Sequence, residues 1–366
     1  MGLNKKHKFF MERCLRIASL GRGRVNPNPM VGCVIVKGGR VVGLGYHEQF
    51  GGPHAEVRAL RQAGKRSVGA TAYVNLEPCS HHGKTPPCVT ALIEAGVGHV
   101  VASTVDPNPL VRGRGFRQLR RAGIRVTTGV LTTESKKLNE KFFFSMETGL
   151  PFVGAKVAQT LDGRTADRMG RSKWITGNAA RAYGHAVRAE YDAVVVGAST
   201  VISDDPELTV RAVKGRNPVR VILDGRFRIG GRRRVFDTSK APTVILTSSA
   251  MLRRNRRKAV ALERKGVQVI GVQGSSRISE SAVLRVLRGL GITSVLIEGG
   301  STTLGSFFEK RMIGKVHCFI HPGLLGSGIS GFAFGGRTLK NALRLTDVSV
   351  RAFAGDLVLE GNVEYP

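Results

Sequence analysis

Short apolar runs rich in β-branched residues alternate with amphipathic segments along most of the chain, and this alternation limits the folds open to it. The runs have the length of buried strands and cover residues 30–36, 70–75, 99–104, 152–158, 193–196, 219–223, 243–246 and 294–297. Segments with helical spacing of apolar residues lie between them, for example 55–63, 89–95 and 281–290. Strands that alternate with helices favour α/β layers with largely parallel pairing.

The length of the chain, 366 residues, is large for a single hydrophobic core. A helix-like stretch over residues 134–148 ends at the sequence Gly-Leu-Pro at 149–151, where glycine and proline stop a helix. A new strand-like run begins directly afterwards. We therefore expect two domains, residues 1–148 and residues 149–366.

Basic residues dominate the charge, since 57 Lys and Arg stand against 26 Asp and Glu and give a net charge of +31. Such an excess is common in proteins that bind nucleic acid. Here it is spread over both halves without a basic tail, and aromatic residues for base stacking make up only 6% of the chain. We expect no nucleic-acid partner, and the charge suits phosphorylated small molecules.

Cysteine usage and hydropathy indicate the compartment. Five cysteines are an odd and sparse set, which argues against a disulfide framework and favours a reducing compartment. No apolar run approaches the roughly 20 residues of a membrane span, and the start of the chain lacks the features of a secretory signal. We expect a cytoplasmic protein without a membrane partner.

Four residues in the first half have the composition of a catalytic zinc site. His54 and Glu56 stand at the entrance of a helix-like stretch, Cys79 follows a strand-like run, and Cys88 opens another helix. One imidazole and two thiolates suit Zn²⁺ and leave its fourth position for water. Glu56 is then the candidate proton carrier. Because residues two apart do not share a helix face, the arrangement requires His54 to lie at the very start of its helix.

The pattern His-x-Glu, followed by Pro-Cys and a second Cys, resembles the zinc nucleobase and nucleoside deaminases. Eight residues, Ser-His-His-Gly-Lys-Thr-Pro-Pro, separate the two cysteines, where the general signature has two. With this loop, Asn-Pro-Asn-Pro-Met-Val-Gly at 26–32 and Asp-Pro-Asn-Pro at 106–109, the first half closely resembles the bifunctional deaminase/reductase family of riboflavin biosynthesis.

For the first domain, the resemblance implies a three-layer fold similar to cytidine deaminase. It assigns the zinc ligands to His54, Cys79 and Cys88, and the proton shuttle to Glu56. Substrate contacts are implied for Asn28, His47, Lys84 and Thr85. An ammonium group and a hydroxyl on a glycine-containing loop suit a ribose 5-phosphate. His81 and His82 are further potential ligands, but we expect them to shape the loop instead.

The second half offers no Gly-x-Gly-x-x-Gly after a strand, so a Rossmann domain is poorly supported. The resemblance to the same family continues through Lys156, Ser-Lys-Trp-Ile-Thr at 172–176, Asp-Asp-Pro-Glu-Leu-Thr-Val-Arg at 204–211 and Glu-Gly-Gly-Ser at 298–301. It therefore covers nearly the whole chain. It implies an α/β reductase domain that is similar to dihydrofolate reductase and uses NADPH.

Site residues of this second domain are also implied by the resemblance. The polar groups around the reduced ribose correspond to Lys156, Asp204 and Glu298. The NADPH contacts correspond to Ala158, Trp174, Thr200, Asp204, Gly300, Ser301, Thr302, Thr303, Leu304, Gly305 and Ser306. The substrate contacts correspond to Ser172, Arg188, Leu208, Arg211 and Glu298. From the residues alone, the Glu-Gly-Gly-Ser turn closes a strand and opens a helix whose free N–H groups suit phosphate, and the single tryptophan fits either the core or a site.

The resulting hypothesis is a bifunctional enzyme of riboflavin biosynthesis that acts as a homo-oligomer. The first domain would remove the 2-amino group of 2,5-diamino-6-(5-phosphoribosylamino)pyrimidin-4-one. The second would reduce the ribosyl group with NADPH to give 5-amino-6-(5-phosphoribitylamino)uracil. Two alternatives stay open: an RNA adenosine or cytidine deaminase with an appended basic domain, and a non-enzymatic zinc module with a fourth protein ligand.

Overall fold

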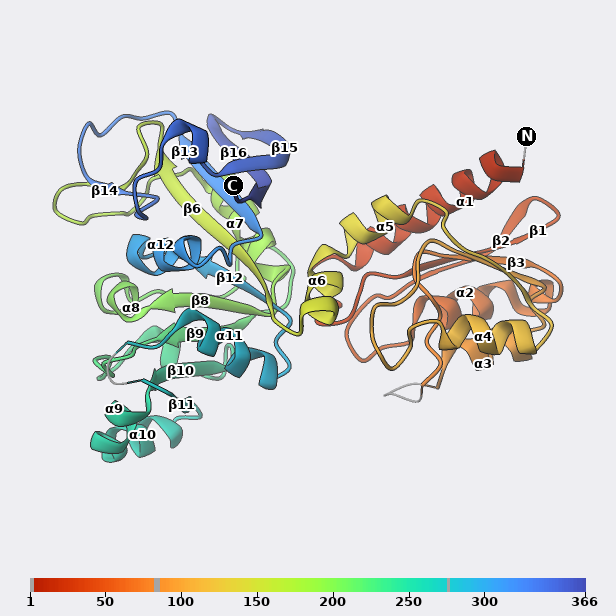
Figure 1. The fold of residues 1–366 in the computed structure, drawn as a ribbon, viewed down its shortest axis with the longest axis horizontal. Coiled ribbons are helices and arrows are strands. Elements are labelled where there is room, and N and C mark those ends of the chain that lie inside the picture. The colour runs from red at the N-terminus through yellow and green to blue at the C-terminus, as the bar shows by residue number, and fades with distance from the viewer. Residues whose placement is uncertain (1–2, 82–85, 275–276) are drawn as a thin grey trace. The chain divides into compact units, whose positions relative to one another are not determined.

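The computed structural model describes residues 3–81, 86–274 and 277–366 (Figure 1). The chain divides into two compact units, Met1–Gly149 and Leu150–Pro366. Within the described ranges, every helix falls short of the length and apolar character that a membrane span requires.

The first unit is built on a five-stranded sheet with the order β2-β1-β3-β4-β5. Its strands are β1 (Gly32–Lys37), β2 (Arg40–Tyr46), β3 (Thr71–Val74), β4 (His99–Ala102) and β5 (Arg125–Thr127). β1 pairs antiparallel with β2 and β3, whereas β3, β4 and β5 are parallel. The helices are α1 (Leu3–Ala18), α2 (Ala55–Ala63), α3 (Cys88–Glu94), α4 (Arg114–Arg121), α5 (Thr132–Leu138) and α6 (Glu140–Thr148), with short 3-10 turns at Ser19–Gly21 and Gly64–Ser67.

Helices cover both faces of this sheet. Alternate side chains of a strand point to opposite sides, so one strand can pack against both helical layers. Cys33 and Ile35 of β1 belong to a buried cluster with residues of α2, α3 and α4. Val34, between them, packs with Phe10 and Met11 of α1. The sheet is therefore the middle of three layers (Figure 1), and the predicted three-layer fold similar to cytidine deaminase is confirmed.

Two glycines of β2 let helix α2 lie directly on the sheet. A Cβ atom on Gly45 would stand 2.3 Å from the carbonyl oxygen of Ala55, and one on Gly43 would stand 2.2 Å from that of Ala59. Such distances are shorter than any real contact, so only glycine fits. This close approach sets the position of the start of α2.

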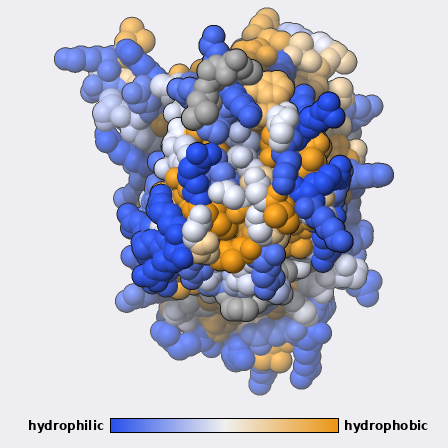
Figure 2. All heavy atoms as spheres, turned by 90° about the vertical axis from the view of Figure 1, so that its right-hand side faces the viewer, coloured by the Kyte–Doolittle hydropathy of each residue, from blue (hydrophilic) through white to orange (hydrophobic). Residues whose placement is uncertain are grey.

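Basic side chains of α4 lie on the solvated face of the helix. In α4, Arg117, Arg120 and Arg121 are exposed, whereas Phe116 and Leu119 point into the core. Figure 2 shows one face of the molecule, which is mostly hydrophilic with a hydrophobic area near its centre. At α4, the basic residues therefore form the polar side of an ordinary amphipathic helix.

The second unit contains a nine-stranded sheet with the order β11-β10-β9-β8-β12-β6-β13-β16-β15. Its strands are β6 (Phe152–Thr160), β8 (Ala193–Gly197), β9 (Val219–Leu223), β10 (Thr243–Ser248), β11 (Gln268–Val272), β12 (Ser294–Glu298), β13 (Lys315–His321), β15 (Arg344–Phe353) and β16 (Asp356–Glu364). Pairing is parallel from β11 to β13, and β16 is antiparallel to both β13 and β15. A separate pair joins β7 (Arg164–Ala166) to β14 (Ile329–Ser330).

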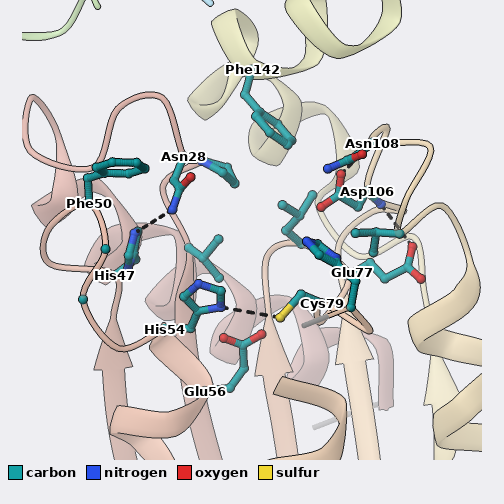
Figure 3. A pocket seen from close by; sticks show the side chains of 17 residues that line it. Asn28, His47, Phe50, His54, Glu56, Glu77, Cys79, Asp106, Asn108 and Phe142 are labelled. Carbon is teal, nitrogen blue, oxygen red and sulfur yellow. Dashed lines mark hydrogen bonds between the residues drawn. The ribbon is translucent and has the colours of Figure 1, made fainter. Parts of the chain in front are cut away.

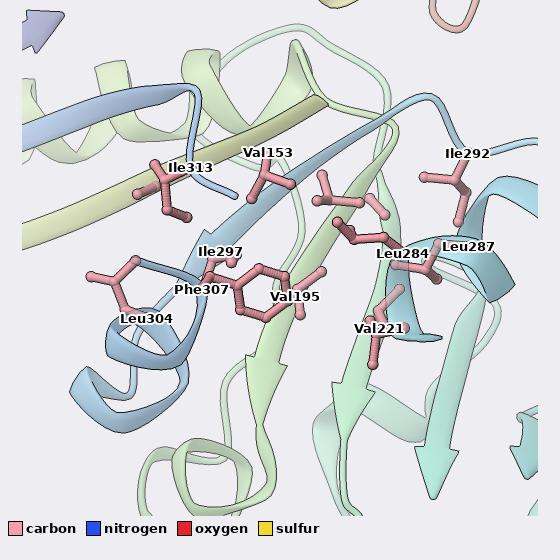
Figure 4. Packing of buried hydrophobic residues seen from close by; sticks show 14 of the residues in the cluster. Val153, Val195, Val221, Leu284, Leu287, Ile292, Ile297, Leu304, Phe307 and Ile313 are labelled. Carbon is pink, nitrogen blue, oxygen red and sulfur yellow. The ribbon is translucent and has the colours of Figure 1, made fainter. Parts of the chain in front are cut away.

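Helices cover both faces of the larger sheet. They are α7 (Asn178–Ala189), α8 (Ala198–Asp204), α9 (Ser249–Arg254), α10 (Arg256–Glu263), α11 (Glu280–Gly289) and α12 (Ser301–Glu309), with 3-10 turns at Arg234–Phe236 and Leu339–Asn341. On one face, Val195 and Ile297 pack against Leu287 of α11 and Phe307 of α12 (Figure 4). Residues of α8 and α10 join a second cluster, and α7 contributes to a third. The predicted α/β class is confirmed.

The predicted single helix over residues 134–148 is wrong, because it is divided into α5 and α6. Asn139 at the break has φ −111° and ψ 28°. Its side chain accepts a hydrogen bond from the backbone N–H of Met30 (2.8 Å) and donates one to the Met30 carbonyl (3.0 Å). This buried contact with a segment far away in the sequence stabilises the break.

Candidate active sites

Three side chains of the first unit that could hold a metal ion converge where two helices begin. His54 is the N-cap residue of α2, Cys88 is the first residue of α3, and Cys79 lies in the loop after β3. The Nδ1 atom of His54 is 3.2 Å from Cys88 Sγ and 3.5 Å from Cys79 Sγ, and all three ligand atoms lie within 4.8 Å of one another. Tetrahedral zinc with ordinary bond lengths separates such atoms by about 3.6 Å. The trio therefore fits one ion.

A cavity of about 260 Å³ is lined by His54 and Cys79 of this trio (Figure 3). Glu56 lines it, in the first turn of α2, and is only 3% exposed. Burial raises the pKa of its carboxyl group, and the neighbouring Cys79 raises it further. His54 lies at the helix entrance as the sequence requires, so His54 and Glu56 reach the same place although they are two residues apart.

Hydrogen bonds within the trio change the pKa of the Cys79 thiol. The backbone N–H of Cys88 donates a hydrogen bond to Cys79 Sγ at 3.3 Å. Hydrogen bonds from Cys88 and His54 outweigh burial and lower the pKa of Cys79 to about 4. A thiolate at this position is the form that binds metal. All five cysteines of the chain are free thiols.

Asn28 and His47 form a polar pair on one side of the cavity (Figure 3). The Nδ1 atom of His47 donates to the carbonyl of Pro53 (3.4 Å), and its Nε2 atom accepts from the Asn28 amide (3.3 Å). Burial lowers the pKa of His47, so the neutral ring is favoured. Lys84, Thr85 and His82 lie outside the described residues. His81 lines the cavity but does not belong to the group of possible metal ligands.

Sequence reasoning missed the role of Glu77, which lies two residues before Cys79. Its carboxylate accepts hydrogen bonds from four backbone N–H groups, those of Asp106, Gly113, Gly115 and Phe116. It thereby holds the segment that carries Asp106 and Asn108 beside the cavity. Burial raises the pKa of Asp106 to about 7. The adjacent Pro-Cys motif is the only local signal at Glu77.

The second unit brings Lys156, Arg188 and Glu298 together. Glu298 ends β12 and pairs in register with Lys156 of the neighbouring β6. Arg188 on α7 binds the Glu298 carboxylate through Nε (2.6 Å) and Nη2 (2.8 Å), and its Nη1 donates to the carbonyl of Thr209 (2.6 Å). Burial alone would raise the pKa of Glu298, but Arg188 and Lys156 outweigh it and hold the pKa at about 2. Burial lowers the pKa of Lys156.

His185, one turn before Arg188 on α7, belongs to the same group and was missed by sequence reasoning. Its Nδ1 atom accepts a hydrogen bond from the backbone N–H of Arg211 at 3.3 Å. Burial, followed by the charge of Arg188, lowers the pKa of His185 to about 4, so the ring is neutral at pH 7. Its spacing of three residues from Arg188 on one helix is a weak sequence signal.

A glycine turn precedes α12 at the end of β12. Gly299 and Gly300 have φ of +75° and +71°, a region that favours glycine. A Cβ atom on Gly300 would lie 3.1 Å from the hydroxyl of Thr200 on α8, so the starts of α8 and α12 are adjacent. Ser301–Ser306 form the first turns of α12, but Leu304 and Gly305 are buried.

The other residues expected around this site lie on separate elements. Trp174 is 69% exposed and lies under the Arg181 guanidinium at 4.5 Å, so the interpretation as core is wrong. Ser172 precedes α7, Ala158 is on β6, and Leu208 is buried after α8. Asp204 ends α8, and in the described parts of the chain no hydrogen bond or ion pair joins it to Lys156 or Glu298.

The two units define a class of protein: a deaminase domain with a zinc site, joined to a reductase domain of the dihydrofolate reductase type. Residues 4–104 match the family model of the cytidine and deoxycytidylate deaminase zinc-binding region, and residues 151–359 match that of the RibD C-terminal domain. The riboflavin biosynthesis protein RibD of Aquifex aeolicus is 43% identical over 353 residues, which are 96% of this chain and 97% of the relative.

Solved structures agree over the full length. RibD of Acinetobacter baumannii has 37% identity and a TM-score of 0.89, with 99% of both chains covered. A diaminohydroxyphosphoribosylaminopyrimidine deaminase/5-amino-6-(5-phosphoribosylamino)uracil reductase of Thermotoga maritima has 39% identity and a TM-score of 0.85, with 100% of both covered. The chain belongs to the RibD family of bifunctional deaminase/reductases in riboflavin biosynthesis, which combine a zinc-binding domain with an NADPH-dependent one. This membership disfavours the RNA deaminase alternative.

Proposed function

We propose that the first unit removes the 2-amino group of 2,5-diamino-6-(5-phosphoribosylamino)pyrimidin-4-one as ammonia. The observation that carries the proposal is the convergence of His54, Cys79 and Cys88, two of which line one cavity together with Glu56. His54, Cys79 and Cys88 would hold zinc, which would supply a water of lowered pKa for attack on the ring carbon. Glu56 would accept a proton from the attacking water and pass it to the leaving amine, and its raised pKa suits both steps.

Polar groups at the rim of the cavity support recognition of the pyrimidine. The Asn28 amide offers hydrogen bonds to the edge of the ring, and the neutral His47 ring, which accepts from that amide, orients it. A direct substrate contact of His47 stays a prediction from the family resemblance. A phosphate contact with Lys84 and Thr85 stays a prediction from the family resemblance. The cavity, at about 260 Å³, is in keeping with a single heterocycle bound close to the trio.

We infer that the second unit reduces the ribosyl group of the deaminated product, with hydride from NADPH. Lys156 and Glu298 are assigned to the ribose, together with Asp204. Three of the five N–H groups of Arg188 are occupied by Glu298 and Thr209. A fourth N–H group, on Nη1, lies 3.5 Å from His185 Nδ1, so Arg188 braces Glu298 and has one N–H group left for substrate. The exposed Arg211 is assigned to the phosphate.

The remaining contacts of the second unit follow the family resemblance. The turn at Gly300 and the start of α12 have free N–H groups that suit the phosphates of NADPH. Thr200 lies against this turn, which supports its assignment to the cofactor. The exposed ring of Trp174 is available to a ligand. Contacts through Ala158, Ser172, Leu208 and Ser301–Ser306 stay predictions.

We also propose that the functional domains are residues 1–148 and 149–366, a division supported by the compact units Met1–Gly149 and Leu150–Pro366. A cytoplasmic location and a homo-oligomeric state belong to the same proposal. Sedimentation of the full chain tests the oligomeric state, and a monomer at all concentrations would contradict it.

The experiment is a coupled assay of the full chain on the diaminopyrimidine phosphate, with ammonia release and NADPH oxidation followed separately. Glu56→Gln should slow ammonia release by about 10²- to 10⁴-fold, because general acid–base catalysis is lost. It should keep its zinc and should still oxidise NADPH with the deaminated substrate. Glu94→Gln, at an exposed position on α3, is the matched control. Undiminished ammonia release in Glu56→Gln would contradict the mechanism.

A further inference from the structure

One aromatic side chain of the cavity has no part in the mechanism above. Phe142 projects from α6 into the cavity, on the side opposite to His54, Glu56 and Cys79 (Figure 3). It is half-buried rather than sealed in the core. The apolar residues Pro29, Val31, Phe50, Leu76 and Val111 also line the cavity, so Phe142 belongs to an apolar wall that suits the face of a ring.

The break between α5 and α6 fixes the position of Phe142. The Asn139 side chain forms hydrogen bonds with both the N–H and the C=O of Met30. Asn28 and Pro29, which precede Met30 in the sequence, line the cavity. Residues three apart share a helix face, so Phe142 is directed to the same side as Asn139. The ring of Phe143 packs edge-to-face against that of Phe142, with centroids 6.0 Å apart and an interplanar angle of 89°.

The chemistry of the cavity leaves the faces of a bound heterocycle to apolar side chains. The amides of Asn28 and Asn108 offer groups that suit the edges of a ring. Among the other lining residues, Phe50 and Phe142 are the two phenylalanines, and Phe50 lies to the side, near Asn28 and His47 (Figure 3). Phe142 lies on the side of the cavity opposite to His54 and Cys79 (Figure 3).

We propose that Phe142 stacks on the pyrimidine of the substrate and presses its reacting edge toward the His54, Cys79 and Cys88 trio. The inference rests on the proposed deaminase function and adds a specificity-determining residue to it. Stacking of a base on an aromatic side chain makes a difference of roughly 5- to 150-fold in affinity. The contact is made with substrate before any bond changes, so it acts mainly on KM.

The test measures ammonia release by the full-length, zinc-loaded chain over a range of diaminopyrimidine phosphate concentrations. Phe142→Ala should raise KM by roughly 5- to 150-fold and change kcat by less than about threefold. Phe142→Tyr, which keeps the aromatic face, should restore KM to within about threefold. Phe144→Ala is the matched control, because Phe144 lies on the same helix, is 37% exposed and does not line the cavity.

The outcomes separate the possible failures. Equal KM values in Phe142→Ala, Phe144→Ala and the wild type would overturn the stacking role, as would a lower melting temperature in Phe142→Ala without a change in KM. Phe142→Leu, which keeps an apolar volume, replaces the alanine variant if that variant does not fold, and a wild-type KM there would also overturn the role. Absence of ammonia release from the wild type would instead refute the deaminase function itself.

Discussion

Removal of the Arg188 guanidinium is the sharpest test of the electrostatics of the second unit. The Arg188 and Glu298 side chains are 12% and 9% exposed, and two hydrogen bonds of 2.6 and 2.8 Å join them. The folded pKa of Glu298 is about 2 against an ordinary value of 4.5. That depression corresponds to about 3 kcal/mol of stability. A second, independent figure agrees: removing one partner of a buried ion pair lowers the free energy of unfolding by about 3–5 kcal/mol.

We therefore expect Arg188→Leu to destabilise the second unit by about 3 kcal/mol at pH 7, which lowers its Tm by roughly 6–12 °C. Because the folded pKa of Glu298 lies below the unfolded one, its contribution is fully present above pH 4.5. It is lost as the pH falls toward 2. The difference between Arg188→Leu and the wild type should shrink over the same range.

Differential scanning calorimetry of the full chain at several pH values measures this difference. Arg285→Leu is the control, since Arg285 is an exposed arginine on α11 of the same unit, and its replacement should change stability by less than about 0.5 kcal/mol. An unchanged Tm in Arg188→Leu at pH 7, or a difference that stays constant down to pH 2, would refute the assigned role of the pair.

Two further predictions concern packing and acid stability. Gly45→Ala should weaken zinc retention during dialysis against a chelator, because its methyl group would lie 2.3 Å from the Ala55 carbonyl and displace the start of α2; Gly289→Ala, where the new methyl meets open space, should not. Glu360→Gln should lessen the loss of unfolding free energy between pH 4.5 and 2. Hydrogen bonds from His317 and Tyr183 outweigh burial and hold the pKa of Glu360 at about 2. Calorimetry measures this pH dependence, and the same loss in Glu360→Gln and the wild type would contradict the prediction.

The metal trio could be predicted from the sequence because each of its residues stands at the end of an element with a clear local pattern. His54 precedes a helix of strong periodicity, and Cys88 begins another. Helix starts and strand ends can be located from local signals, so their convergence at one edge of an α/β sheet was predictable. The contacts of Glu77 were not, because its four partners lie 29 to 39 residues away and no local pattern marks them.

The sequence by itself determined the α/β layers, the family and the identity of the possible zinc ligands, since these depend on periodicity and on motifs within short segments. Only the tertiary structure decided that Asn139 divides a helix, that Arg188 is engaged by Glu298, and that Phe142 lines the same cavity as His54 and Cys79. The physical reason is that each of these depends on a contact between distant segments. Such a contact outweighs local preference only when the fold has brought its partners together.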